Sequence, residues 1–224
     1  MRSGIFALAA ALAVTAPAFA QTAQQPAATA QTQNAAERFK AYATSEGYKK
    51  NIGQLAVMGA SVSHPECKDQ KALNRSELIF YSYPQFGEGL HPVTGLWQDR
   101  IRMDSCGQSG HQNILLKAQP DGKPPEVALL MPGTSAATPP VQNLILKDII
   151  TALAAKNCSD TTLIIPSDTA MGKESKPRKV NAKGVLIEGA WKEVWTFRAC
   201  GKTVKANVDL NADGKGGLVH KVKL

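Results

Sequence analysis

Two acidic residues stand among aromatic side chains, and they are the strongest candidates for chemistry in this sequence. Asp99 follows Trp97 by two positions, and Glu193 follows Trp191 by two positions. Because side chains alternate between the faces of a strand, each acid shares a face with its tryptophan. A carboxylate in apolar surroundings must be paired or hydrogen-bonded, or its pKa rises. Two roles follow: an acid that lines a ligand groove or acts in catalysis, and a structural acid held by neighbouring donors.

Both acids belong to an internal duplication of the chain. Residues 95–99 and 189–193 share the pattern Gly-x-Trp-x-acid and lie 94 positions apart. The same offset aligns Cys106 with Cys200, and a glycine follows each cysteine. The chain has only 3 Trp and 4 Cys, so this joint match indicates a true repeat. A period of about 92 residues is too long for a solenoid unit and favours a duplicated small domain.

The four cysteines indicate disulfide bonds, because an even number in an exported chain is typical of them. The sequence alone permits three pairings. The duplication favours the two pairings within the copies, Cys67 with Cys106 and Cys158 with Cys200. Each bond closes a loop of about 40 residues and is expected to stabilise its unit by roughly 4 kcal/mol.

The first 20 residues are typical of a secretory signal peptide. Arg2 supplies a positive charge, residues 5–14 are apolar, and residues 18–20 (Ala-Phe-Ala) have the small side chains of a cleavage site. The apolar run is shorter than the roughly 20 residues of a membrane span. We expect export to the periplasm, cleavage after Ala20, and no transmembrane segment in the mature chain. Residues 21–35, rich in Gln, Ala, Thr and Pro, are predicted to form a disordered leader.

The rest of the chain divides into two repeat units, residues 36–131 and residues 141–224. A Pro-rich linker of residues 132–140 joins them. Apolar residues at helical spacing predict a helix over residues 141–157, and its counterpart in residues 36–60 contains glycines that suggest breaks. Strand-like runs and Asp-Gly turns follow each helix. The predicted fold class is α+β, with each unit one helix packed on an antiparallel sheet of about four strands.

The segment before each Trp strand differs most between the copies. It is aromatic in the first copy and basic in the second. The side chains that we single out as candidate contacts are Tyr81, Tyr83, Phe86, Lys176, Arg178 and Lys179. Loops that diverge between duplicated units often carry specificity. A basic run is also commonly just a solvated surface, so both readings stay open.

The net charge points to the kind of partner. The chain has a formal charge of +8 at pH 7. In the periplasm a basic protein meets lipid phosphates and acidic proteins rather than nucleic acid. The expected partner is therefore an envelope protein or an anionic envelope component, and the oligomeric state stays open.

Metal and cofactor motifs are not apparent in the sequence. Residues 209–214 resemble the start of a calcium loop, but position 12 of that loop is His220 instead of the required Glu. A hairpin turn at Asp213-Gly214 is the favoured interpretation. The nucleophile-elbow, zincin, Walker and dinucleotide motifs do not occur. We expect neither a metal nor a cofactor.

Three functions remain open at this point. The preferred one is a non-enzymatic binding or accessory protein that uses loop and sheet surfaces. The second is a carrier of an apolar or amphipathic ligand, with Trp97, Trp191 and Trp195 lining its pocket. The third is an enzyme that uses Asp99 or Glu193. Duplicated halves share scaffolding more often than catalysis, so a structural role for both acids is favoured.

Overall fold

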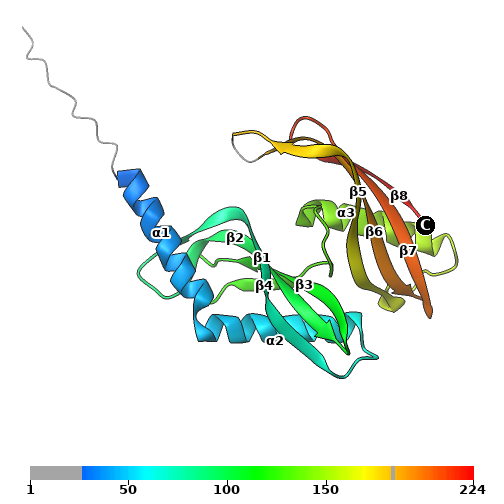
Figure 1. Cartoon of the computed structure of the whole chain (residues 1–224), viewed down its shortest axis with the longest axis horizontal. Helices are drawn as coiled ribbons and strands as arrows, with labels where there is room; N and C mark the ends of the chain where they lie inside the picture. Colours follow the sequence, from blue (N-terminus) through cyan, green and yellow to red (C-terminus); the bar gives the residue numbers. More distant parts are fainter. Residues whose placement is uncertain (1–26, 183–184) are drawn as a thin grey trace, which may run out of the picture.

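The computed structural model describes residues 27–182 and 185–224, which form two units side by side (Figure 1). The first unit contains α1 (Ala27–Thr44), α2 (Glu46–Ser63), β1 (Gln70–Phe86), β2 (Pro92–Ser105), β3 (Gln108–Lys117) and β4 (Glu126–Leu129). The second contains α3 (Pro139–Ala154), the 3₁₀ helix η1 (Thr161–Leu163), β5 (Ile164–Val180), β6 (Leu186–Ala199), β7 (Lys202–Ala212) and β8 (Leu218–Lys223). In both units helical segments precede the strands.

The strands of each unit form one antiparallel sheet. Sheet A has the order β1-β2-β3-β4, and sheet B has the order β5-β6-β7-β8. The strand register repeats between the units: Trp97 lies opposite Leu116, and Trp191 lies opposite Leu210. Both members of the second pair are 94 positions from their counterparts. The predicted α+β class with two similar units is therefore confirmed.

The Cys-Gly pair of each repeat forms a tight hairpin corner. Cys106 and Gly107 have φ of 54° and 81°, and Cys200 and Gly201 have φ of 47° and 76°. A two-residue hairpin with both φ values positive matches the right-handed twist of the flanking strands. The repeated motif therefore sets the turns between β2 and β3 and between β6 and β7.

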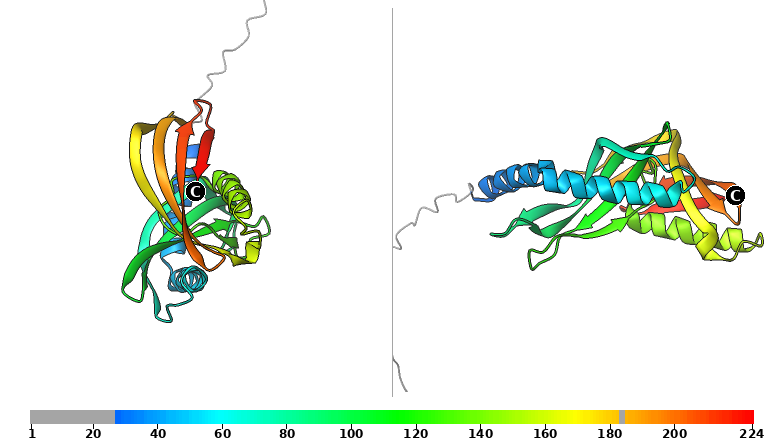
Figure 2. Two further views of the ribbon diagram at one scale, coloured as in Figure 1. Left: turned by 90° about the vertical axis from the view of Figure 1, so that its right-hand side faces the viewer. Right: turned by 90° about the horizontal axis from the view of Figure 1, so that it is seen from below.

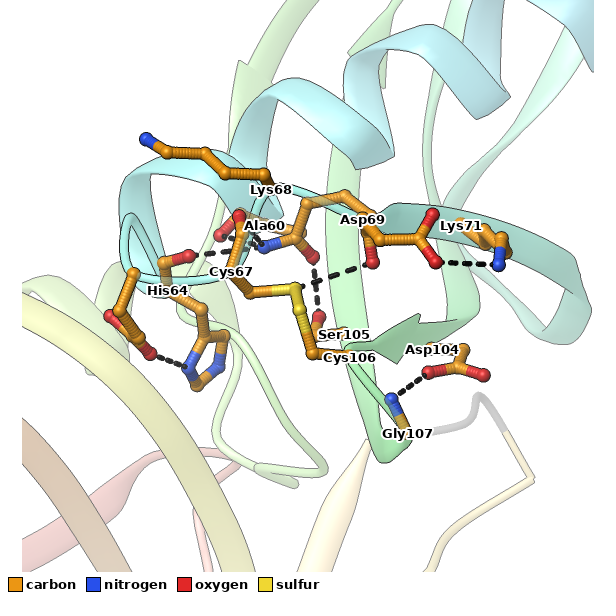
Figure 3. Close-up of a disulfide and its surroundings, with 12 residues drawn as sticks. Ala60, His64, Cys67, Lys68, Asp69, Lys71, Asp104, Ser105, Cys106 and Gly107 are labelled. Carbon is orange, nitrogen blue, oxygen red and sulfur yellow. Dashed lines mark hydrogen bonds and ion pairs between the residues drawn. A yellow bond between two sulfur atoms is a disulfide. The ribbon is translucent and has the colours of Figure 1, made fainter.

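Both predicted disulfides are confirmed. Cys67 pairs with Cys106 at a Cα–Cα distance of 5.8 Å, and Cys158 pairs with Cys200 at 5.9 Å. Figure 3 shows the first bond joining the segment after α2 to the β2–β3 corner, where the Gly107 amide donates to Asp104. Each disulfide thus ties the end of a helix to a hairpin corner of its own sheet.

The N-terminal helix corrects one boundary of the sequence analysis. The leader predicted for residues 21–35 extends too far, because α1 begins at Ala27. Alanine has the highest helix propensity, so an Ala-rich stretch of low hydrophobicity still forms a helix where it can dock. Ala35 is such a docking residue, with 7% of its surface exposed. Residues 21–26 lie outside the described part of the chain.

The first unit has two helices where one was predicted. The break lies at Ser45, which caps α2 by accepting a hydrogen bond from the Tyr48 amide at 3.3 Å. Serine is a preferred residue at the start of a helix, because its hydroxyl accepts a hydrogen bond from a first-turn amide that has no backbone acceptor. The glycines that suggested breaks all lie inside α2: Gly47, Gly53 and Gly59.

Each sheet buries one face against its helices. Figure 2 shows α1 and α2 running along one side of sheet A. The core of the first unit is formed mainly by Phe39, Ile52, Ala56, Trp97, Ile101, Met103 and Ile114. The core of the second unit is formed mainly by Ile145, Ile149, Leu153, Trp191, Trp195, Phe197 and Val208. The opposite face of each sheet, here called its open face, carries polar and charged residues.

The predicted linker is an ordered bridge between the two sheets. The Gly133 amide donates to the His111 carbonyl on β3 at 2.9 Å. The next residue, Thr134, donates its amide to the Thr169 carbonyl on β5 at 2.6 Å. α3 begins at Pro139, so the helix takes in the last two residues of the predicted linker.

Two arginines add contacts between the units. Arg198 on β6 donates to the Val62 carbonyl near the end of α2 at 3.1 Å and lies 3.7 Å from Glu66. Arg100 on β2 donates to the Ser135 carbonyl of the linker at 3.0 Å. These contacts and the linker hold the two units against each other.

The helices and the disulfides both give information about the cellular compartment of the protein. In the described part of the chain, no helix is long and apolar enough to cross a membrane. Stable disulfides are typical of proteins outside the reducing cytosol, so the two bonds fit an extracytoplasmic protein. The signal peptide predicted for residues 1–20 lies outside the described residues.

Candidate functional site

Asp99 is completely buried between α2 and sheet A. Its carboxylate accepts a hydrogen bond from the Tyr48 hydroxyl and pairs with the Arg75 guanidinium. The Tyr48 hydroxyl in turn accepts a hydrogen bond from Trp97 Nε1 at 2.8 Å. Burial raises the pKa of the Asp99 carboxyl, and Arg75 acts against this rise. The carboxylate therefore ties α2 to β1 and β2.

Glu193 occupies the corresponding position in the second unit and is also completely buried. Its Oε1 accepts hydrogen bonds from Trp191 Nε1 and from the Ala136 amide, both at 2.9 Å. Its Oε2 accepts a hydrogen bond from Trp195 Nε1 at 2.8 Å. One carboxylate thus satisfies two core indoles and fastens the linker to β6.

The burial of both motifs corrects part of the predicted contact surface. Trp97, Trp191, Asp99 and Glu193 were expected to contact a ligand or partner, but each is at most 2% exposed. A strand face that packs under a helix cannot also meet a partner without opening the core. Trp195 is 0% exposed as well, so none of the three tryptophans presents an open surface to solvent.

The aromatic segment of the first copy lies on the long strand β1 and not on a loop. Tyr81 is on the open face and donates its hydroxyl to Gln98 Oε1 at 2.7 Å. Burial raises the pKa of Tyr81 to about 12. Tyr83 is 37% exposed and contacts Phe80, whereas Phe86 lies under the Arg38 guanidinium, 4.7 Å from its ring centroid.

The basic segment of the second copy is likewise a strand, since it forms the end of β5. Lys176 and Lys179 both pair with Glu188 on β6, at 3.1 Å and 3.5 Å. Arg178 pairs with Glu174 at 3.0 Å and also lies over the Trp191 ring. Glu188 on the neighbouring strand and Glu174 on β5 itself therefore neutralise much of the charge that the linear sequence suggested.

The structure brings members of both segments to one cleft between the units. A cavity of about 360 Å³ is lined by Tyr81, Arg178, Arg100 and linker residues such as Ser135. The Arg100 guanidinium in this cavity already has partners, because it donates to Asn113 at 2.9 Å and to Ser135 and also pairs with Glu77. The cleft is therefore mainly a polar seam that joins the units.

A basic surface that the sequence analysis missed covers the open face of sheet B. Residues 141–224 contain 14 Lys and Arg against 8 Asp and Glu, whereas residues 36–131 contain 11 against 10. The exposed lysines on this open face, here called the basic face, are Lys192, Lys205, Lys221 and Lys223. Alternation with buried Val208 and Leu210 is the sequence signal that identifies the face.

The lysines of the basic face lie on three neighbouring strands. Asp209 on β7 lies opposite both Lys192 and Lys221, and it pairs with Lys192 at 3.3 Å. Lys223 lies opposite Asn207, so its strand neighbour adds no negative charge. The basic face therefore has a net positive charge, and the charged groups are separate lysine ammonium groups on a regular sheet.

The candidate calcium loop has the contacts of a turn. The Asp213 carboxylate accepts hydrogen bonds from the amides of Lys215 at 2.7 Å and Gly217 at 2.8 Å. These hydrogen bonds lower the pKa of Asp213. Within residues 27–182 and 185–224, no cluster of three or more His, Cys, Asp or Glu is placed to hold a metal ion.

His111 is the histidine for which a pH dependence of stability is expected. Burial and the nearby Arg100 and Arg102 lower its pKa from 6.5, while Asp168 acts in the opposite direction. The unfolded chain then binds more protons than the folded chain just below pH 6.5, so His111 costs stability as the pH falls. We expect His111→Gln to become more stable relative to wild type between pH 7 and pH 5, measured by urea unfolding. A difference that does not change with pH would contradict this assignment.

Comparison with protein families, with curated proteins and with solved structures gives no match to this chain. Geometry and surface charge therefore have to indicate the function of this protein.

Proposed function

We propose that this protein is a non-catalytic binding protein of the periplasm that contacts the anionic lipid surface of the envelope. The observation that carries the proposal is the basic face of sheet B, with four exposed lysines on three adjacent strands. The net positive charge of the second unit supports the same partner chemistry.

The composition of the basic face favours a lipid surface over a protein partner. Lysine is depleted in the cores of protein–protein interfaces, which instead use aromatic residues and Arg as anchors. The side chains between the lysines include the polar Thr196 and Asn207 and the short apolar Val194, and none of them is aromatic. Each Lys close to an anionic membrane contributes about 1 kcal/mol of attraction.

The buried acids support a non-catalytic role. Asp99 and Glu193 were the candidates for catalysis, and both use their oxygens to hold core side chains or the linker. The periplasmic location is supported by the signal-like first 20 residues and by the two disulfides.

Neutralising two lysines of the basic face is expected to weaken membrane binding. The variant Lys205→Gln/Lys223→Gln loses about 2 kcal/mol of attraction, which corresponds to a roughly 30-fold weaker association. The measurement is co-sedimentation with vesicles that contain phosphatidylglycerol, with phosphatidylcholine vesicles as the neutral reference. Added salt should weaken binding in the same direction.

The matched control changes the same net charge on the other unit. Lys40→Gln/Lys50→Gln removes two exposed lysines from α1 and α2. We expect this variant to bind nearly as well as wild type. Equal losses in both variants would show that only net charge matters. Binding that favours an acidic protein over anionic vesicles would likewise overturn the proposal.

A further inference from the structure

A groove on the first unit is a second candidate binding site, and it is separate from the basic face. It has a volume of about 640 Å³ and runs between α2 and the β3–β4 hairpin, with the β1–β2 loop at one end. This volume lies within the roughly 300–1,000 Å³ range of ligand sites in proteins. Sheet B contributes no residue to its lining.

The walls of the groove are apolar and partly open to solvent. Leu55 and Met58 line it from α2, while Leu116 and Val127 line it from the sheet. Met58 is 52% exposed, Val127 is 49% exposed, and Leu90 at the loop end is 75% exposed. Large apolar side chains gathered at one concave surface gain free energy when a ligand removes them from water.

One end of the groove offers a small set of polar groups. The Tyr42 hydroxyl lies 3.2 Å from His91 Nδ1, and both residues line the groove. Burial and the negative charge of Asp99 raise the pKa of Tyr42 to about 12, so its hydroxyl stays neutral. Tyr48 is also at this end, but its hydroxyl already donates a hydrogen bond to Asp99 and accepts one from Trp97.

The charge of the lining decides the class of ligand. Among the described residues, none of those that line the groove is Lys, Arg, Asp or Glu, although these make up 20% of the chain. An anionic head group would find no permanent positive charge there, and the buried acid Asp99 is held by the hydroxyl of Tyr48, which lines the groove. A neutral polar group, by contrast, can exchange hydrogen bonds with Tyr42 and His91.

We propose that this groove binds a neutral amphiphile, with its acyl or aromatic body along α2 and its polar group at Tyr42 and His91. The site is independent of the basic face, since no lysine of that face lines it. Such a ligand would bury Met58, Val127 and Leu90 and leave the fold of the first unit unchanged.

Two fluorescent probes of similar shape test the proposal. N-phenyl-1-naphthylamine is neutral, and 1-anilinonaphthalene-8-sulfonate adds a negative charge to the same ring system. We expect the neutral probe to bind one site per chain, at least tenfold more tightly than the sulfonate. The expected order is the opposite of what the net charge of +8 alone would give.

Two variants place the probe in the groove. Gly47 lines the groove, and a Cβ at this position would meet nothing within 4 Å, so Gly47→Leu is chosen to place a side chain in the groove. Val127→Glu puts a charge on the exposed apolar wall. Each variant is expected to bind the neutral probe at least tenfold more weakly than wild type. The circular dichroism spectrum of each variant should be unchanged. The control Val219→Glu changes a residue of similar exposure, 62%, on β8 and should bind normally.

Several outcomes would overturn the proposal. They are tighter binding of the sulfonate, equal losses in Val127→Glu and Val219→Glu, and saturation at many probes per chain. Light scattering gives a further one: if Val127→Glu converts a dimer to a monomer, the groove is an interface between two copies. Loss of vesicle binding in Lys205→Gln/Lys223→Gln with normal probe binding would separate this site from the basic face.

Discussion

Gly133→Ala is expected to separate the two units without unfolding either of them. Gly133 has φ of 92°, and a Cβ at this position would lie 2.1 Å from the Thr169 carbonyl oxygen and 2.3 Å from the Thr169 nitrogen. Both atoms belong to the backbone of β5, so a side-chain rotation cannot relieve the overlap. The bridge between β3 and β5 must open, while each unit keeps its own core and disulfide.

The opening is measured by small-angle scattering and by limited proteolysis. We expect a larger radius of gyration and new cleavage within residues 132–138, with circular dichroism close to wild type. Gly214→Ala is the matched control, because it has a similar φ of 78° but nothing within 4 Å of the added Cβ. That variant should show only a backbone penalty of about 1–2 kcal/mol. A compact, protease-resistant Gly133→Ala protein would contradict the bridge.

Glu193→Gln is expected to destabilise the second unit by about 2–4 kcal/mol. The substitution keeps the shape of the side chain but replaces one acceptor oxygen by an NH₂ group. In wild type the two oxygens accept from two indoles and from the Ala136 amide. In the variant at least one buried donor loses its acceptor, and the NH₂ group faces N–H groups.

The loss is measured by urea unfolding at pH 7 with the disulfides intact. Glu188→Gln is the control on the same strand, because its partly exposed carboxylate pairs with the surface residues Lys176 and Lys179. We expect that control to change the free energy of unfolding by less than about 1 kcal/mol. A loss for Glu193→Gln as small as that of the control would show that the buried acid is not a structural anchor.

The repeat signature allowed much of the fold to be predicted. Trp and Cys at one offset identified the duplication, the disulfide pairs and the strand that carries each tryptophan. These predictions succeeded because core aromatic residues and disulfides constrain both copies in the same way. The helix break at Ser45 could have been predicted from the serine, because a serine that caps a helix is a stronger local signal than glycines that α2 tolerates in its interior.

The candidate surface was harder to predict for a physical reason. A charge run along the chain, such as that around Lys176, lies on a strand whose neighbour supplies Glu188. Lys205 and Lys223 are far apart in sequence and share a face only because β7 pairs with β8. The charge of a sheet surface therefore depends on which strands pair, and a local stretch of sequence does not show this pairing.

The most direct test of the proposed function is a nuclear magnetic resonance titration of the protein with anionic lipid nanodiscs. We expect the largest amide perturbations on the strands of the basic face, around Lys192, Lys205, Lys221 and Lys223. Neutral nanodiscs should produce none of these changes. Perturbations centred on α1 and α2, or equal effects from neutral lipid, would contradict the assignment of the basic face as the membrane-binding surface.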